Sequence, residues 1–206
     1  MNRKYDASRR MEMAQRTRES ILKAAFRLHG QGIFDMESLA KEANVSVATV
    51  RKHFSTREAL FEGCTTLGMT LVQMPDFGAI AAVEGSADRA REAVRQVYTL
   101  HEALLGQAWS AFKLEDESPA LAAALQQIES VVAAGAEVIT AAWPARAETS
   151  DPFRAFVAGM LSPLTYRALR VQAGLLLDEA ASQVAEALIR AGQSAPKTKE
   201  GATAYR

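Results

Sequence analysis

The chain has 206 residues, of which 49% are hydrophobic and 23% charged, a length that suits one medium domain or a small domain joined to a larger one. Its single cysteine, Cys64, excludes an internal disulfide and a multi-cysteine metal cluster, and its three widely spaced histidines form no metal-binding pair, so no metal or cofactor is expected. No apolar run is long enough to span a membrane, and the N-terminus lacks the apolar core of a secretory signal, which together predict a soluble, globular, cytoplasmic protein.

The net charge of zero hides an uneven distribution along the chain. Residues 1–67 hold 12 Lys and Arg against 8 Asp and Glu, a net charge of +4, which leaves −4 for the remainder. A basic N-terminal third is typical of a protein that meets a polyanion at one end. By this measure alone, chance unevenness on a solvated surface explains the numbers equally well.

The pattern of apolar residues predicts four helices in the first part of the chain. Apolar residues recur with a helical period, and no segment alternates like a strand. We expect a basic, flexible arm over residues 1–15, and then a helix that ends at Gly30 and Gly32, because glycine takes the left-handed C-terminal conformation freely. Three further helices follow, the last reaching about Pro75, and the residues suited to cap them are Asp35, Ser46 and Ser55.

Longer helices are predicted beyond a connector over residues 76–85. Capping residues, prolines and glycines mark where these helices begin and end. The first runs from 86 to either 106 or 113, and the others cover 118–143, 151–172 and 178–192. Ser162-Pro163 predicts a kink or bulge inside the third of these, because proline interrupts the hydrogen-bond ladder. The tail, residues 193–206, is short of apolar residues and predicted to be disordered. The expected fold class is all-α, with about nine helices.

Residues 39–54 form the motif with the clearest chemistry, a helix-turn-helix. Asn44 lies where the first helix of the motif must stop, and asparagine is the non-glycine residue that best tolerates a positive φ. Val45, Val50 and Phe54 are expected to pack against the preceding long helix. Exposed side chains then remain on and before the second helix, which begins after Ser46, and these are Ser46, Val47, Ala48, Thr49, Arg51, Lys52 and His53.

Such a helix fits the major groove of B-DNA, which is about 12 Å wide and presents base edges. Arg51 is equally suited to a base contact and to a phosphate contact, while Val47 and Ala48 can touch thymine methyl groups. Thr49, Lys52 and His53 are expected to contact phosphates, which position the protein without reading sequence. His53 is equally suited to supporting the helix pair.

Residues 16–67 resemble the DNA-binding domain of the TetR family of bacterial transcriptional regulators. The resemblance rests on these residues: Ile21-Leu22-Lys23-Ala24-Ala25-Phe26, Gly32, Leu39-Ala40, Ala43, Val45-Ser46, Thr49-Val50, His53-Phe54 and Arg57-Glu58-Ala59-Leu60. It implies a three-helix DNA-binding domain over residues 16–67 and a helical domain for ligand binding and dimerisation over residues 68–192. It further implies a homodimer, most often a repressor, that leaves a palindromic double-stranded DNA operator when a small-molecule effector binds.

The resemblance also bears on single residues near the motif. Arg57 stands at the usual lysine position that opens the fourth helix, so a phosphate contact is implied for it. Arg51 stands where the family usually has tyrosine, and Asp35 where a threonine commonly meets phosphate. The connection from Gly32 to Leu39 is also about two residues shorter than usual, so the operator sequence is not implied.

The C-terminal part offers candidates for an effector site. A pocket in a helical bundle is mostly apolar with a few polar groups, which suits a small apolar or amphipathic effector. Each candidate is also suited to the core, and His101 is the best single one, because a buried hydrogen-bonding group needs a partner. The candidates are Tyr98, His101, Leu105, Trp109, Phe112, Met160 and Tyr166.

The family forms its dimer through the last two helices. The apolar side chains that could supply this interface are Phe153, Phe156, Val157, Leu161, Leu164, Leu169, Leu176, Val184 and Leu188. Cys64, on an apolar helical face, is expected to be a small core residue rather than a redox sensor.

Two other classes of function compete with a DNA-binding regulator. One is a helical small-molecule-binding protein whose DNA-binding motif is degenerate, which Arg51, Asp35 and the short connection would favour. The other is an enzyme, and it is the least favoured, because the sequence shows no metal set, phosphate loop or nucleophile–base pair of recognisable spacing.

Overall fold

The computed structural model describes residues 3–143 and 151–194, and the regular elements over these ranges are helical, as predicted. Within the same ranges no helix has the length and apolar character needed to cross a membrane. Residues 195–206 of the predicted tail lie outside the described ranges.

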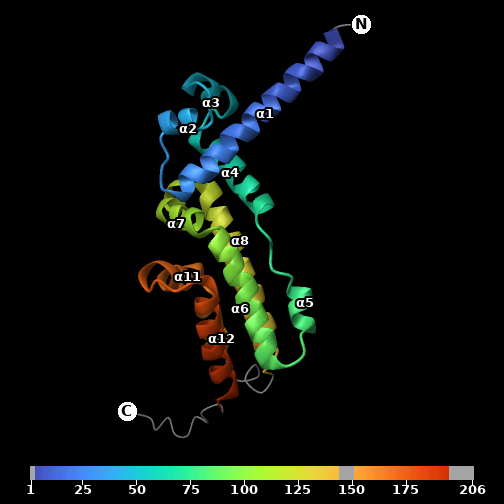
Figure 1. Ribbon diagram of the computed structural model, residues 1–206, viewed down its shortest axis with the longest axis vertical. Helices are drawn as coiled ribbons and strands as arrows, with labels where there is room; N and C mark the ends of the chain where they lie inside the picture. The colour runs from blue at the N-terminus through green and yellow to red at the C-terminus, as the bar shows by residue number, and fades with distance from the viewer. Residues whose placement is uncertain (1–2, 144–150, 195–206) are drawn as a thin grey trace, which may run out of the picture. The chain divides into compact units, whose positions relative to one another are not determined.

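The N-terminal part forms four helices, of which the second and third make the predicted helix-turn-helix (Figure 1). Their bounds are α1, Arg3–Gly30; α2, Met36–Glu42; α3, Val47–His53; and α4, Arg57–Leu71. Asp35 and Ser46 cap α2 and α3 as predicted, each accepting a backbone hydrogen bond from the residue three positions on. The cap of α4 is Thr56 rather than the expected Ser55, and Asn44 has the predicted positive φ, 55°.

Helix α1 begins at Arg3, so residues 3–15, expected to be a flexible arm, are helical in the structure. The segment carries no Gly or Pro before Gly30, and good helix formers such as Met, Ala, Glu and Arg fill it. Its exposed positions lack an apolar stripe, and periodicity therefore gave no sign of the helix.

The remaining helices begin and end near the residues that the sequence analysis predicted, apart from the differences described after their bounds. They are α5, Phe77–Ala82; α6, Ser86–Ala103; α7, Leu105–Leu114; the 3₁₀ turn η1, Glu115–Glu117; α8, Pro119–Thr140; α10, Asp151–Leu161; α11, Pro163–Arg167; the π-helical turn η2, Ala168–Gln172; and α12, Leu177–Gln193. A short helix, α5, occupies the expected connector, and the helix after Ser86 breaks at Leu104. The predicted interruption at Ser162-Pro163 is confirmed, and η2 follows α11 directly.

Compactness divides the chain into two units, residues 1–73 with 100–129, and residues 74–99 with 130–206. The first unit therefore adds α7, η1 and the first part of α8 to the four N-terminal helices. Helix α1 packs against both α4 and α7, which explains this grouping. The sequence analysis predicted one boundary near residue 67. In the structure, α7 lies beyond that boundary in the chain but packs with the N-terminal helices in the first unit.

Candidate functional site

Helix α3 presents a polar and basic outer surface. Ala48, Arg51 and Lys52 are exposed, while Val47, Thr49 and His53 are half-buried. The Ser46 hydroxyl accepts the Thr49 backbone N–H at 3.1 Å and lies 2.9 Å from the Thr49 hydroxyl. The structure thus places all seven predicted residues on α3 or at its cap, with the charged ones in its last turn.

The opposite side of α3 is anchored in the core of the N-terminal helices. Val50 and Phe54 are 0% and 1% exposed, and they pack in a cluster that includes Ile21, Leu39 and Leu60. Arg51 follows Val50 by one residue, which turns its side chain by about 100° around the helix axis, and it is exposed. The anchoring keeps the outer surface of α3 available to a ligand as large as a duplex.

Arg18 of α1 holds the C-terminal end of α3 in place. Its guanidinium lies 4.2 Å from the centre of the Phe54 ring and donates a hydrogen bond of 3.3 Å to the His53 carbonyl oxygen. The sequence analysis did not find this positioning role. No local pattern marks it, because the contact joins residues 35 positions apart.

Arg57 and Asp35 flank the motif, and both have partners in the protein. The Arg57 guanidinium lies 4.9 Å from the Phe61 ring centre and 3.4 Å from a Glu117 carboxylate oxygen. Exposed ion pairs of this kind contribute little to stability. Hydrogen bonds from Ser38 lower the pKa of Asp35, and its carboxylate is therefore ionised and bound to the N-terminus of α2.

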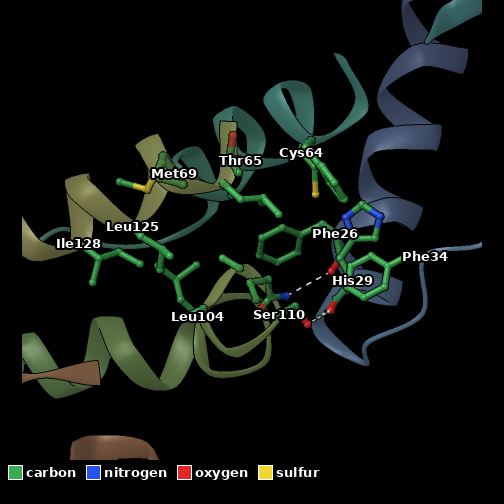
Figure 2. Close-up of a pocket in the computed structure, with 17 residues that line it drawn as sticks. Phe26, His29, Phe34, Cys64, Thr65, Met69, Leu104, Ser110, Leu125 and Ile128 are labelled. Atoms are coloured by element: carbon green, nitrogen blue, oxygen red, sulfur yellow. Dashed lines mark hydrogen bonds between the residues drawn. The ribbon is translucent and has the colours of Figure 1, made fainter. Parts of the chain in front are cut away.

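The first unit also contains an apolar cavity of about 70 Å³ (Figure 2). Its walls come from α1, α4, α7, α8 and the segment before α2. None of its lining side chains is charged, and the apolar ones include Phe26, Phe34, Phe61, Leu104, Leu125 and Ile128. Figure 2 shows Cys64, Thr65 and Met69 of α4 directed toward the same space as Leu104, Leu125 and Ile128.

The polar atoms around the cavity have defined roles. Ser110 and Gln107 donate hydrogen bonds of 2.6 and 3.2 Å to the carbonyl oxygens of His29 and Phe26, near the C-terminus of α1 (Figure 2). Burial lowers the pKa of His29 to about 4 and raises the pKa of Cys64 to about 12. The imidazole and the thiol are therefore both uncharged at neutral pH.

Glu58 of α4 binds the N-terminus of α8. One carboxylate oxygen accepts a hydrogen bond of 2.7 Å from the Ser118 hydroxyl, and the other accepts one of 2.6 Å from the Ala120 N–H. These bonds satisfy groups at a helix N-terminus, where a negative charge is also favoured by the helix dipole. They join α4, which follows the DNA-binding motif, to α8.

The seven predicted effector-site residues do not line this cavity. Tyr98, Met160 and Tyr166 lie in the second unit, where the two tyrosine rings are 4.5 Å apart and the Tyr98 hydroxyl donates to the Met160 carbonyl. The other four belong to the first unit, and they are His101, which is buried, Leu105, Trp109 and Phe112. The cavity was missed because five separate segments supply its lining.

The depressed pKa of His29 predicts a loss of stability in acid. As pH falls from 6.5 to about 4, the unfolded chain binds a proton that the folded chain excludes, and the free energy of unfolding therefore decreases. A difference of this size corresponds to about 3 kcal/mol when complete. Urea unfolding at pH 7.5 and 4.5 should show that His29→Phe loses less stability on acidification than the unchanged protein. Equal losses would show that His29 does not control this dependence.

The N-terminal helices enclose a buried core, and α3, the second helix of the motif, presents a basic outer surface. This arrangement defines the class of helix-turn-helix DNA-binding domains. Residues 21–64 match the sequence model of the bacterial regulatory proteins of the tetR family. No curated protein matches the sequence significantly.

Several solved structures share the fold. One, from Mesorhizobium loti and assigned to the TetR family of transcriptional regulators, has 22% identity and a TM-score of 0.59, over 86% of this chain and 97% of that one. A transcriptional regulator from a Rhodococcus species has 20% identity and a TM-score of 0.57, over 87% and 99%. The multidrug binding protein EbrR, complexed with imidazole, has 18% identity and a TM-score of 0.52, over 88% and 92%. The N-terminal helix-turn-helix thus matches the family model, and the three solved structures, each below 25% identity, share the fold of the chain.

Proposed function

We propose that this protein is a transcriptional repressor that binds a palindromic double-stranded DNA operator as a homodimer and leaves it when a small apolar or amphipathic effector binds. The observation that carries this proposal is the outer surface of α3, where Arg51 and Lys52 are exposed while Val50 on the opposite side is fully buried. In this proposal Arg51 reads a base, Val47 and Ala48 contact base edges, and the remaining contacts go to phosphates from Ser46, Thr49, Lys52, His53 and Arg57.

The second unit supplies apolar surface for the proposed dimer. Phe156, Leu164, Val171 and Leu176 are all more than 40% exposed, which is unusual for side chains of this size. Five of the residues expected at the interface instead form the core of the chain itself, and they are Phe153, Val157, Leu161, Val184 and Leu188. Their burial in one chain follows from the packing of α10 against α12.

Selection of bound duplexes from a random pool, followed by measurement on the selected site, tests the proposal. Arg51→Ala is expected to relax preference at one base-pair position by about 5- to 150-fold, because a bidentate base contact discriminates by about 1–3 kcal/mol. Lys52→Ala should instead weaken binding to all duplexes evenly and reduce the salt slope of log K by about 1. Fluorescence anisotropy at several salt concentrations measures both effects.

Lys113→Ala on α7 is the control, since it removes a cation away from α3. It should change neither preference nor salt slope. An equal loss on every sequence from Arg51→Ala would remove the base-reading role from that residue.

A helical small-molecule-binding protein with a degenerate motif is the alternative, and the apolar cavity favours it. The two are distinguished by duplex binding at low salt in the absence of any ligand. A regulator binds the selected duplex under these conditions, whereas the alternative binds small molecules and shows no measurable affinity for DNA.

A further inference from the structure

The turn η1 carries three carboxylates close to the start of α4. Glu115, Asp116 and Glu117 are consecutive, and all three are exposed. Of these, Glu117 contacts α4, with a carboxylate oxygen 3.4 Å from a guanidinium nitrogen of Arg57. Arg57 is the residue of α4 to which the proposed function gives a DNA phosphate. An acidic side chain of the same protein therefore contacts the cation that the phosphate requires.

The guanidinium of Arg57 is restrained by two aromatic rings. Its central carbon lies 4.9 Å from the centre of the Phe61 ring and 5.8 Å from the centre of the Phe34 ring. Contacts of this kind hold the long side chain in place, while its N–H donors stay available to an oxygen ligand. The Arg57 side chain is 47% exposed, so it is open to a ligand from solution.

Hydrogen bonds beside Glu117 keep the acidic turn against α4. The Glu58 carboxylate accepts hydrogen bonds from the buried Ser118 hydroxyl and from the Ala120 N–H, directly after the turn. An exposed ion pair alone would hold Glu117 only weakly. Because the next residue is bound to α4, however, the Glu117 carboxylate stays near Arg57 even when the ion pair is broken.

We propose that Glu117 competes with DNA phosphate for Arg57, and that the turn η1 thereby limits the affinity of the protein for duplexes. A carboxylate and a phosphate offer a guanidinium the same kind of oxygen acceptor, so they compete for the same N–H groups. Where a phosphate displaces Glu117, the carboxylate remains close and repels it. This inference rests on the proposed function, since the competition matters only if Arg57 contacts DNA.

Glu117→Gln removes the negative charge and keeps the size of the side chain. At low salt, the dissociation constant for the selected duplex should fall about two- to fivefold, a range set by the modest strength of exposed ion pairs. An unrelated duplex should gain by the same factor, because phosphate contacts carry no sequence information. The gain should shrink as salt is added, because salt screens the charges. Fluorescence anisotropy measures all three effects.

Asp116→Asn is the matched control, since Asp116 is exposed in the same turn and makes no ion pair within the described residues. It should change duplex affinity by less than about 1.5-fold, because solvent weakens charges that are not in contact. Arg57→Gln completes a double-mutant cycle, and in this background Glu117→Gln should gain no more than Asp116→Asn does. Where Arg57→Gln fails to fold, the two substitutions in the exposed turn still decide the result.

Three results would overturn the competition and leave the proposed function standing. They are no gain from Glu117→Gln, a gain equal to that of Asp116→Asn, and a gain that persists undiminished in Arg57→Gln. The second would mean that only the overall charge of the turn matters. Absence of duplex binding by the unchanged protein at low salt would instead refute the proposed function, and this inference with it.

Discussion

Gly106→Ala is expected to destabilise the protein by about 3 kcal/mol or more, because α7 meets the end of α1 backbone to backbone at this point. A Cβ atom at Gly106 would lie 2.1 Å from the Gly30 carbonyl oxygen and 2.9 Å from its carbonyl carbon. Backbone atoms cannot turn aside as a flexible side chain does, so α7 must separate from α1. Thermal unfolding should show a decrease in Tm of about 10 °C for a chain of this length.

Gly159→Ala is the matched control for this substitution. Gly159 lies near the end of α10, and nothing lies within 4 Å of the position that its Cβ would take. Alanine is favoured over glycine in a helix by about 1 kcal/mol, so this variant should be equal to or more stable than the unchanged protein. Similar Tm values for the two variants would show that the contact between Gly106 and Gly30 is not close.

Glu58→Ala should reduce the free energy of unfolding by about 2 kcal/mol, since it removes two hydrogen bonds to a charged acceptor. The Ser118 hydroxyl and the Ala120 N–H at the start of α8 would lose their partner. Glu58→Gln should lie between, because its amide oxygen can still accept one of these bonds. Chemical denaturation measures the three proteins under the same conditions.

Glu62→Ala is the control for the loss of a carboxylate from α4. Glu62 is exposed one turn after Glu58, and surface substitutions of this kind usually change stability by less than about 0.5 kcal/mol. Equal effects of the Glu58 and Glu62 substitutions would mean that the bonds to α8 contribute no net stability.

The DNA-binding motif was found from the sequence because its determinants are local. Capping by Asp35 and Ser46 depends on a backbone N–H three residues away, and the left-handed turn at Asn44 depends on one residue. The period that buries Val50 and Phe54 also exposes Arg51 and Lys52. Each of these features can be inferred within one or two helical turns.

The apolar cavity of the first unit was not found in the same way. The predicted effector residues lie elsewhere, since Tyr98 packs on Tyr166 in the second unit and Trp109 is partly exposed, and their role stays a prediction. Helical periodicity identifies which side of a helix is buried and not which helix covers it. Phe26 and His29 were accordingly interpreted only as part of the long N-terminal helix.

The amino-acid order alone was sufficient for the all-α class, the helix-turn-helix and the residues on its outer side, since short-range hydrogen bonding and periodicity control these features. Tertiary packing decided that α7 joins the N-terminal helices, that Arg18 supports α3, and that His29 lines a cavity without charged side chains. These contacts join residues 35 to 81 positions apart, as the hydrogen bonds of Arg18 to His53 and of Ser110 to His29 show. They depend on how helices approach one another, and no local pattern of side chains determines that approach.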